Sequence, residues 1–138
     1  MIYNSNSWCA PAHIIEKLDT TQRRHLRRIL NIHWPTGHIS NNELYRRCNV
    51  GKLSDRILKF RWTMLGHVLR SSIDTLAFLS LKFALSNNLK SRKSRHQMNL
   101  FNVICNDLKS RNYNLESIDE LYQLREVASD RSHWKLMF

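Results

Sequence analysis

The sequence predicts an all-α protein in which five to six helices pack around a central helix near residues 55–70. Apolar residues recur at helical spacing along most of the chain. Only 3 of the 138 residues are glycine and 2 are proline, too few for the turns of a many-stranded sheet. A chain of this length is expected to form a single domain, residues 1–138, that buries roughly two-thirds of its unfolded surface.

The first helix is predicted over Pro11 to Asn31, because its isoleucines and leucines share one half of a helical wheel and its arginines fill the other. The Trp34-Pro35-Thr36-Gly37 run ends this helix, since a residue before proline avoids helical backbone angles. Ser40-Asn41-Asn42-Glu43 fits a capping box and predicts a short second helix to about Cys48, closed by a turn at residues 49–51.

The central helix is predicted to begin at Asp55, with Ser54 as its cap, and to end at Arg70. Its apolar arc is broad, which is typical of a helix that contacts several neighbours, so this helix is expected to organise the core. Phe60 and Trp62 fall on the arc and are interpreted as core residues rather than as aromatics that stack on bases.

Arg61 also falls on the apolar arc of the central helix. A buried guanidinium needs a carboxylate or carbonyl partner, because an isolated buried charge is prohibitively costly. Glu43, Asp55 and Asp130 are candidate partners, and the sequence does not choose among them.

Asp74 is placed to cap a fourth helix that runs through Leu85. Residues 86–95 are polar, basic and aperiodic, and predict a flexible loop. This loop is expected to separate a basic front part with four helices, residues 11–85, from a smaller helical back part, residues 96–138.

The back part is predicted to contain two helices. Apolar residues at helical spacing indicate the first, from about His96 to Arg111. A second capping-box match at Ser117-Ile118-Asp119-Glu120 begins the last helix, which is expected to extend to Trp134. Trp34 and Trp134 are interpreted as core anchors.

The chain is strongly basic, with 22 Lys and Arg against 11 Asp and Glu and a net charge of +11. Residues 1–111 hold 19 of the basic residues and 6 of the acidic ones, so the positive charge lies in this part of the chain. A positive electrostatic field attracts polyanions, so nucleic acid is the leading candidate partner. The alternatives are an acidic protein partner and a basic surface that is only solvated. The candidate nucleic-acid contacts are Arg23, Arg24, Arg27, Arg28, Lys59, Arg70, Lys90, Arg92, Lys93 and Arg95.

No catalytic or metal-binding set is evident in the sequence. The only adjacent acidic pair, Asp119-Glu120, fits a helix start, and His33 and His38 lack the paired ligand spacing of a zinc site. The three glycines are isolated, so no phosphate-binding glycine loop is expected, and neither a cofactor nor a small-molecule substrate is predicted.

Features that would place the chain outside the cell or in a membrane are missing from the sequence. The three cysteines are far apart and odd in number, which favours a reducing compartment. The first residues lack the pattern of a signal peptide, and the most apolar window, Ile73 to Leu85, is shorter than the ~20 residues of a membrane span. An intracellular protein, nuclear or cytoplasmic, is expected.

Several segments, in order along nearly the whole chain, resemble the region downstream of the polymerase core in endonuclease-reverse transcriptases of non-LTR retrotransposons. Tyr3-Asn4-Ser5-Asn6-Ser7-Trp8 is similar to that family's Tyr-Gly-Ser-Glu-Thr-Trp. The run from His25 to Trp34 is similar to its Cys-Leu-Arg-Arg-Ile-Leu-Gly-Ile-x-Trp, and residues 42–45, 58–70 and 130–134 also match. Residues 90–98 keep the charge of the family's basic turn but lack its Gly, Pro and Trp.

The resemblance implies a fragment without the polymerase and endonuclease regions, and the aromatic-x-Asp-Asp turn of a reverse transcriptase is absent from this sequence. The expected function is therefore that of a non-catalytic helical accessory region that binds the RNA or DNA backbone without sequence specificity. Alternatives are a module that docks on an acidic protein, and a degenerate retroelement fragment without selected activity.

Overall fold

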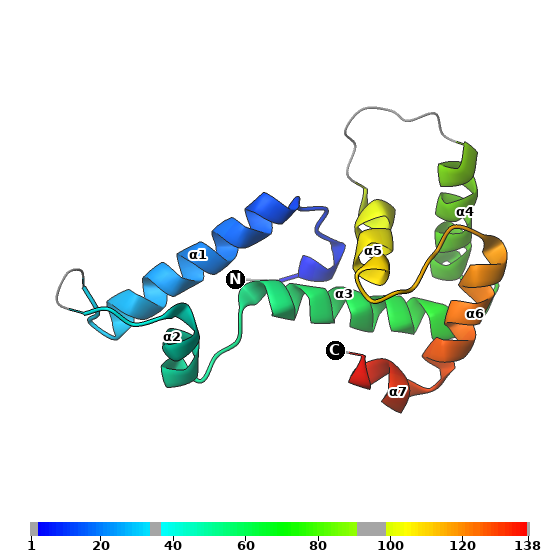
Figure 1. Ribbon diagram of the computed structural model, residues 1–138. Helices are drawn as coiled ribbons and strands as arrows, with labels where there is room; N and C mark the ends of the chain where they lie inside the picture. The colour runs from blue at the N-terminus through cyan, green and yellow to red at the C-terminus, as the bar shows by residue number, and fades with distance from the viewer. Residues whose placement is uncertain (1–2, 34–36, 91–98, 138) are drawn as a thin grey trace. The chain divides into compact units, whose positions relative to one another are not determined.

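The protein is all-α, as the sequence predicts. The computed structural model describes residues 3–33, 37–90 and 99–137, the side chains of residues 88–90 excepted. These residues form one 3₁₀ turn and seven α-helices and no strand (Figure 1). The elements are η1 (Ser5–Ser7), α1 (Ala12–Ile29), α2 (Asn41–Cys48), α3 (Leu53–Arg70), α4 (Leu76–Lys90), α5 (Leu100–Lys109), α6 (Ile118–Ser129) and α7 (Arg131–Leu136).

The chain divides into two compact units, and the division falls within α3. The α1–α2 unit comprises Ala10–Leu58, and the core unit comprises the described residues up to Cys9 and from Lys59 onward. The basic segment at residues 86–95, expected to separate a front from a back part, does not coincide with this division. The physical reason is that α3, α4, α5 and α6 share one hydrophobic core, which continues past that segment.

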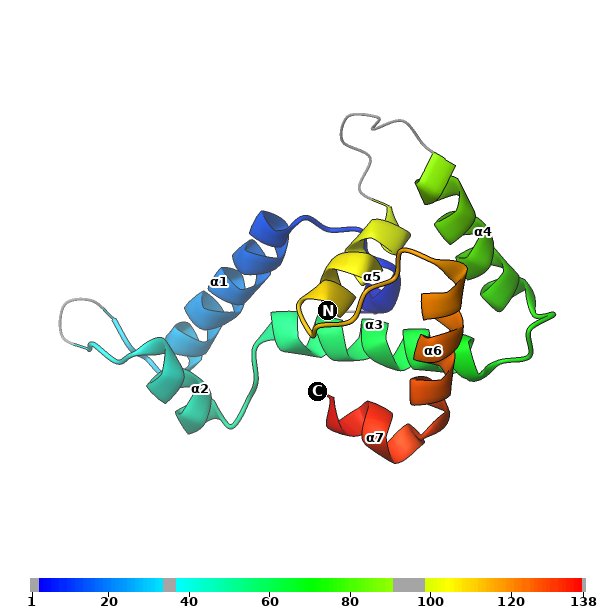
Figure 2. The same ribbon diagram turned by 45° about the vertical axis from the view of Figure 1, so that its right-hand side comes forward.

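In the core unit, one end of α5 lies against the green α3, and α6 crosses α3 near its C-terminal end (Figures 1 and 2). Trp62 of α3 and Trp134 of α7 are both 2% exposed, and their rings stack with centroids 4.4 Å apart. Each indole N–H donates to the backbone carbonyl of the other tryptophan, at 3.3 and 3.2 Å. This reciprocal pair confirms both as core residues and attaches α7 to α3 without an unsatisfied indole.

Arginines from α3 and α6 cap each other's C-terminal ends. Arg125 of α6 donates from Nη1 to the carbonyl oxygens of Leu69 and Ser71, both at 2.8 Å, and its guanidinium lies over the Phe78 ring. Arg70 donates from Nη1 to the Ala128 carbonyl at 2.9 Å. The last carbonyls of a helix have no partner within it and carry partial negative charge, so cationic donors satisfy both requirements.

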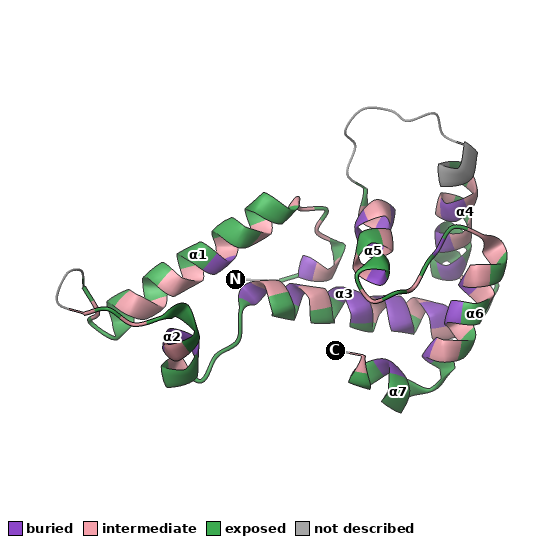
Figure 3. Cartoon of the chain, in the orientation of Figure 1, coloured by how far each residue is buried: buried purple, intermediate pink, exposed green. Residues whose placement is uncertain are grey.

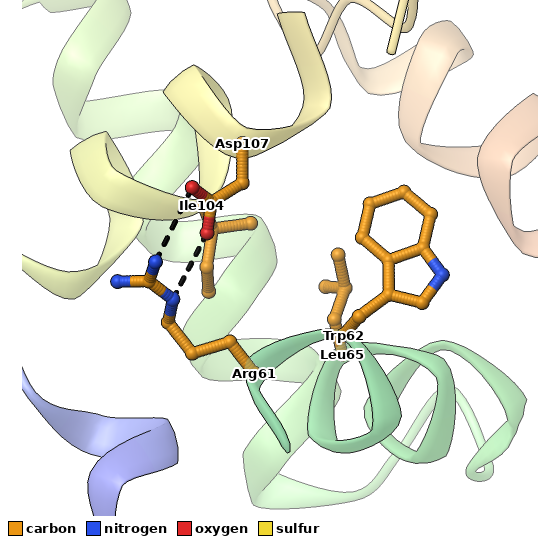
Figure 4. A pocket seen from close by; sticks show the side chains of 5 residues that line it. All are labelled: Arg61, Trp62, Leu65, Ile104 and Asp107. Atoms are coloured by element: carbon orange, nitrogen blue, oxygen red, sulfur yellow. Dashed lines mark hydrogen bonds and ion pairs between the residues drawn. The ribbon is translucent and has the colours of Figure 1, made fainter. Parts of the chain in front are cut away.

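Arg61 is buried, and its partner is Asp107 of α5 (Figure 4). Nε lies 2.9 Å from Oδ2, and Nη2 donates to Oδ1 at 3.3 Å. Burial raises the pKa of Asp107, against the opposite influence of the Arg61 and Arg111 charges. Trp62, Leu65 and Ile104 complete the surroundings of the pair, a crevice without room for a water molecule.

None of the three expected partners of Arg61 was correct. Glu43 pairs with arginines of its own helix, Asp130 accepts the first amides of α7, and Asp55 is exposed. Phe60 was predicted to be a core residue, but its side chain is 41% exposed. The apolar arc of α3 is wider than the surface that the neighbouring helices cover, and Phe60 lies on the uncovered part.

Helix ends differ from the predictions where a side chain from elsewhere decides them. The first two helices are close to their predicted ranges, Ser40 caps α2, and Asn49 closes it in the left-handed region with φ 50°. Glu43 does not complete the capping box, since its carboxylate binds two arginines. The central helix begins at Leu53 rather than Asp55, and Ser54 lies inside it.

The later helix boundaries also changed. Asp74 lies two residues before α4, and α4 continues to Lys90, through the first half of the predicted loop. Asn99 caps α5 at Leu100. The capping box at Ser117 is complete, but Asp130 ends α6 with extended backbone and caps a separate α7. Residues 34–36 and 91–98, including Trp34, lie outside the described residues.

We predict that Gly66→Ala destabilises the protein. A Cβ at this position of α3 would lie 2.8 Å from Cδ1 of Trp134, within the tryptophan stack. Overpacking costs about 1–3 kcal/mol, which exceeds the ~1 kcal/mol that alanine gains over glycine in a helix. Urea unfolding measures the change. Gly51→Ala, which would meet no heavy atom within 4 Å, is the matched control and should not lower stability.

We further predict that Asp107→Asn lowers the free energy of unfolding by about 2–4 kcal/mol, because it leaves the Arg61 charge buried without a counter-charge. Replacing both members, Arg61→Met with Asp107→Leu, should recover most of the loss. Asp74→Asn, at an exposed position, should change stability by less than about 0.5 kcal/mol. Equal losses in the single and double variants would contradict a charge effect.

Candidate nucleic-acid interface

The candidate interface lies on α1, which is largely exposed along its length (Figure 3). On its apolar half, Ile14 is 37% and Ile29 77% exposed. Asp19 is the one buried residue of α1, with 7% of its surface exposed. The α1–α2 unit has few other core side chains, so it covers only the middle of the apolar half of α1.

Two polar side chains fix the rotation of α1 by capping α3. Asp19 accepts a hydrogen bond from the Ser54 amide at 3.0 Å. Gln22 accepts from the Leu53 amide at 3.1 Å and donates to the Gly51 carbonyl at 2.9 Å. These bonds satisfy amides that a helix N-terminus leaves free, and they turn the face with Asp19 and Gln22 inward.

This rotation divides the four α1 arginines into two pairs. Arg23 and Arg27 are half-buried and bonded internally. Arg23 donates to the Thr20 hydroxyl at 2.9 Å, and Arg27 donates to the Asn41 side chain at 2.8 Å. Arg24 and Arg28 are exposed and make no hydrogen bond or ion pair with any described residue.

Lys17 extends the outer pair into a stripe. At about 100° per residue, Lys17, Arg24 and Arg28 lie within an arc of roughly 40°, opposite the face with Asp19 and Gln22. Arg24 and Arg28 are about 6 Å apart along the helix, and Lys17 is about 10 Å before Arg24. We call these three residues the outer stripe. Sequence analysis missed Lys17, although its spacing of seven and eleven residues from the arginines could have identified it.

The arginines of α2 are neutralised by an acidic neighbour. The Glu43 carboxylate forms ion pairs with two arginines: Oε2 lies 2.8 Å from Nε of Arg46, and Oε1 lies 2.7 Å from Nε of Arg47. Hydrogen bonds from these two guanidinium groups lower the pKa of Glu43 to about 2, so the carboxylate stays charged over the physiological range. The outer stripe differs from α2 because no described acidic side chain pairs with it.

The remaining predicted contacts have different environments. Lys59 is exposed on α3, in the core unit. Arg70 is half-buried and bonded to Ala128, and burial, with the nearby charge of Arg131, lowers its pKa. Lys90 ends α4 but its side chain is not among those described, and Arg92, Lys93 and Arg95 lie outside the described residues.

Other reactive groups do not form a site in the described part of the chain. No group of three His, Cys, Asp or Glu residues there could hold a metal ion. Burial raises the pKa of the Cys105 thiol to about 11, so it stays protonated at neutral pH. None of the described helices has both the length and the apolar character that a bilayer crossing requires.

Comparison with known proteins adds no relative: no protein family matches the chain, and no curated protein or solved structure is significantly similar to it.

The pKa of Glu43 predicts how its contribution to stability depends on pH. Because the folded-state pKa lies below the ordinary value of 4.5, the contribution is present above pH 4.5 and is lost as the pH falls toward 2. Glu43→Gln should therefore lower the thermal midpoint at pH 7, with a difference from the wild type that disappears near pH 2. Glu126→Gln, which removes the same charge from an exposed position of α6, is the control and should change the thermal midpoint at pH 7 less than Glu43→Gln does.

Proposed function

We propose that the chain binds the sugar-phosphate backbone of RNA or DNA without sequence specificity, through the outer stripe of α1. The observation that carries the proposal is the pair Arg24 and Arg28, exposed one helical turn apart with no described partner. Guanidinium groups donate in pairs to phosphate oxygens, and binding releases the counterions condensed on the nucleic acid.

Lys17 and the net charge of +11 support the same proposal. A helix of 18 residues is long enough to lie along a backbone, and the cations of the outer stripe recur at separations comparable to those of phosphates on one strand. Glu16, the other acidic residue of α1 besides Asp19, lies about 100° from Lys17 on the helix and does not interrupt the stripe.

We infer from the resemblance to the post-polymerase region of non-LTR retrotransposon reverse transcriptases that this binding belongs to an accessory region. In that role the chain would hold template, primer or target while another part of a polyprotein performs the chemistry, in the nucleus or the cytoplasm. We propose no catalytic step for this chain, since its sequence supplies no residue set for one.

Arg23 and Arg27 receive a different role in this proposal. The hydrogen bond of Arg27 to Asn41 joins α1 to α2, and that of Arg23 to Thr20 lies within α1. Both arginines therefore contribute to the positive field of α1 without being assigned a phosphate contact. Lys59, Lys90, Arg92, Lys93 and Arg95 remain predicted contacts, and Arg70 would have to leave the Ala128 carbonyl to make one.

We predict that the double variant Arg24→Ala, Arg28→Ala weakens binding to RNA, duplex DNA and hybrid by roughly tenfold at moderate salt. The slope of log affinity against log salt should decrease by roughly 1.4–1.8, the value for two lost phosphate contacts. Filter binding across a salt series measures both quantities.

The matched control is Arg46→Ala, Arg47→Ala, which removes the same charge from a site that Glu43 already neutralises. It should leave the slope nearly unchanged. Equal effects of the two double variants would indicate attraction by net charge alone. Competition by poly-glutamate as strong as by RNA would instead favour an acidic protein as the partner.

A further inference from the structure

Helix α4 is apolar on two opposite faces, and only one of them is covered. Phe78, Leu81 and Leu85 are buried in the core unit. On the other face, Leu76 is 83%, Leu79 43% and Phe83 69% exposed, at the i, i+3, i+7 spacing of one helical stripe. A contiguous exposed stripe of large apolar side chains is often a functional surface of a protein.

From Leu76 to Asn87 the exposed face of α4 carries no charged side chain. Among the described side chains of this helix the one charged group is Lys82, which lies at the flank with its ammonium 5.9 Å from the centre of the Tyr122 ring. A partner that covered the face would therefore desolvate no ion. The absence of charge stands out in a chain with a net charge of +11.

The same face has small residues beside its large ones. Beside the ridge of Leu76, Leu79 and Phe83 lies a short row of two exposed small residues, Ala77 and Ser80, and the next small residue on that side, Ala84, is half-buried against the core. Helices pack when the ridge of one enters the groove of the other. In an antiparallel pair centred near Leu79 and Ser80, Leu76 of one copy lies opposite Phe83 of the second, and each ridge meets the small row of the other copy.

We propose that α4 is a self-association surface through which two copies of the chain form a weak antiparallel dimer. The three large side chains expose roughly 300–400 Å² of apolar area, taking about 150–200 Å² for each fully exposed side chain. A standard interface buries about 800 Å² per partner, of which about 57% is apolar, so α4 supplies most of the apolar part.

Charge explains why the dimer is weak and why α4 is the face that forms it. Two copies with a net charge of +11 each repel one another, and a neutral face is where they can approach at the least electrostatic cost. Antiparallel helices also place the positive end of one dipole near the negative end of the other. Added salt screens the repulsion, so it should strengthen self-association, whereas it weakens nucleic-acid binding.

Sedimentation velocity of the nuclease-treated full chain, from about 10 to 500 µM and at two salt concentrations, tests the proposal. We expect a concentration-dependent dimer that is stronger at the higher salt. Leu76→Gln with Phe83→Gln should weaken it by at least tenfold. Ile29→Gln with Leu136→Gln, which replaces two side chains exposed to a similar extent on other helices, should not.

Disulfide cross-linking tests the orientation, in a background where Cys9 and Cys48 are serine. Ser80→Cys lies near the proposed two-fold axis and should cross-link two copies, whereas Asn87→Cys should not, because antiparallel packing separates the two positions 87. Cross-linking of both variants would indicate parallel packing. A chain that stays monomeric throughout, or a dimer insensitive to the α4 substitutions, would overturn the proposal.

Discussion

The structure depends on side chains that satisfy the two ends of α3. At its N-terminus the free amides bind Asp19 and Gln22 of α1, and at its C-terminus Arg125 of α6 binds two carbonyls. Each partner has the charge or polarity that the helix end requires, an oxygen acceptor at the N-terminus and a cation at the C-terminus. The division between the two compact units falls within α3, so each unit contains one end of this helix.

The capping at the N-terminus has a consequence for the candidate interface. The hydrogen bonds of Asp19 and Gln22 fix the rotation of α1 about its own axis, so only the opposite face of the helix can be exposed. Because Asp19 and Gln22 point inward, Lys17, Arg24 and Arg28 point outward, and Arg23 and Arg27 lie at the flank, where they bond within the unit. The proposed affinity for nucleic acid thus originates in a structural requirement of α3 rather than in the number of arginines.

The fold class and most helices were predictable because they depend on local properties: apolar spacing, capping residues and the scarcity of glycine and proline. The stacked tryptophans were predictable only as buried residues, since their mutual hydrogen bonds join positions 72 residues apart. The Arg61 partner was not predictable, because helical periodicity shows that Arg61 faces the core but not which acidic residue of another helix lies there. Asp107 is 46 positions away, and it is the tertiary packing of α5 that brings it within 2.9 Å.

The sequence by itself determined that this protein is helical, that its charge is basic and that α1 carries four arginines, because composition and periodicity are properties of the chain alone. Tertiary structure decided which of those arginines remain available and which apolar face of α4 is left uncovered. The physical reason is that both outcomes depend on which groups of distant helices meet. A side chain's local pattern gives its direction on a helix, whereas its partner is set by how that helix packs.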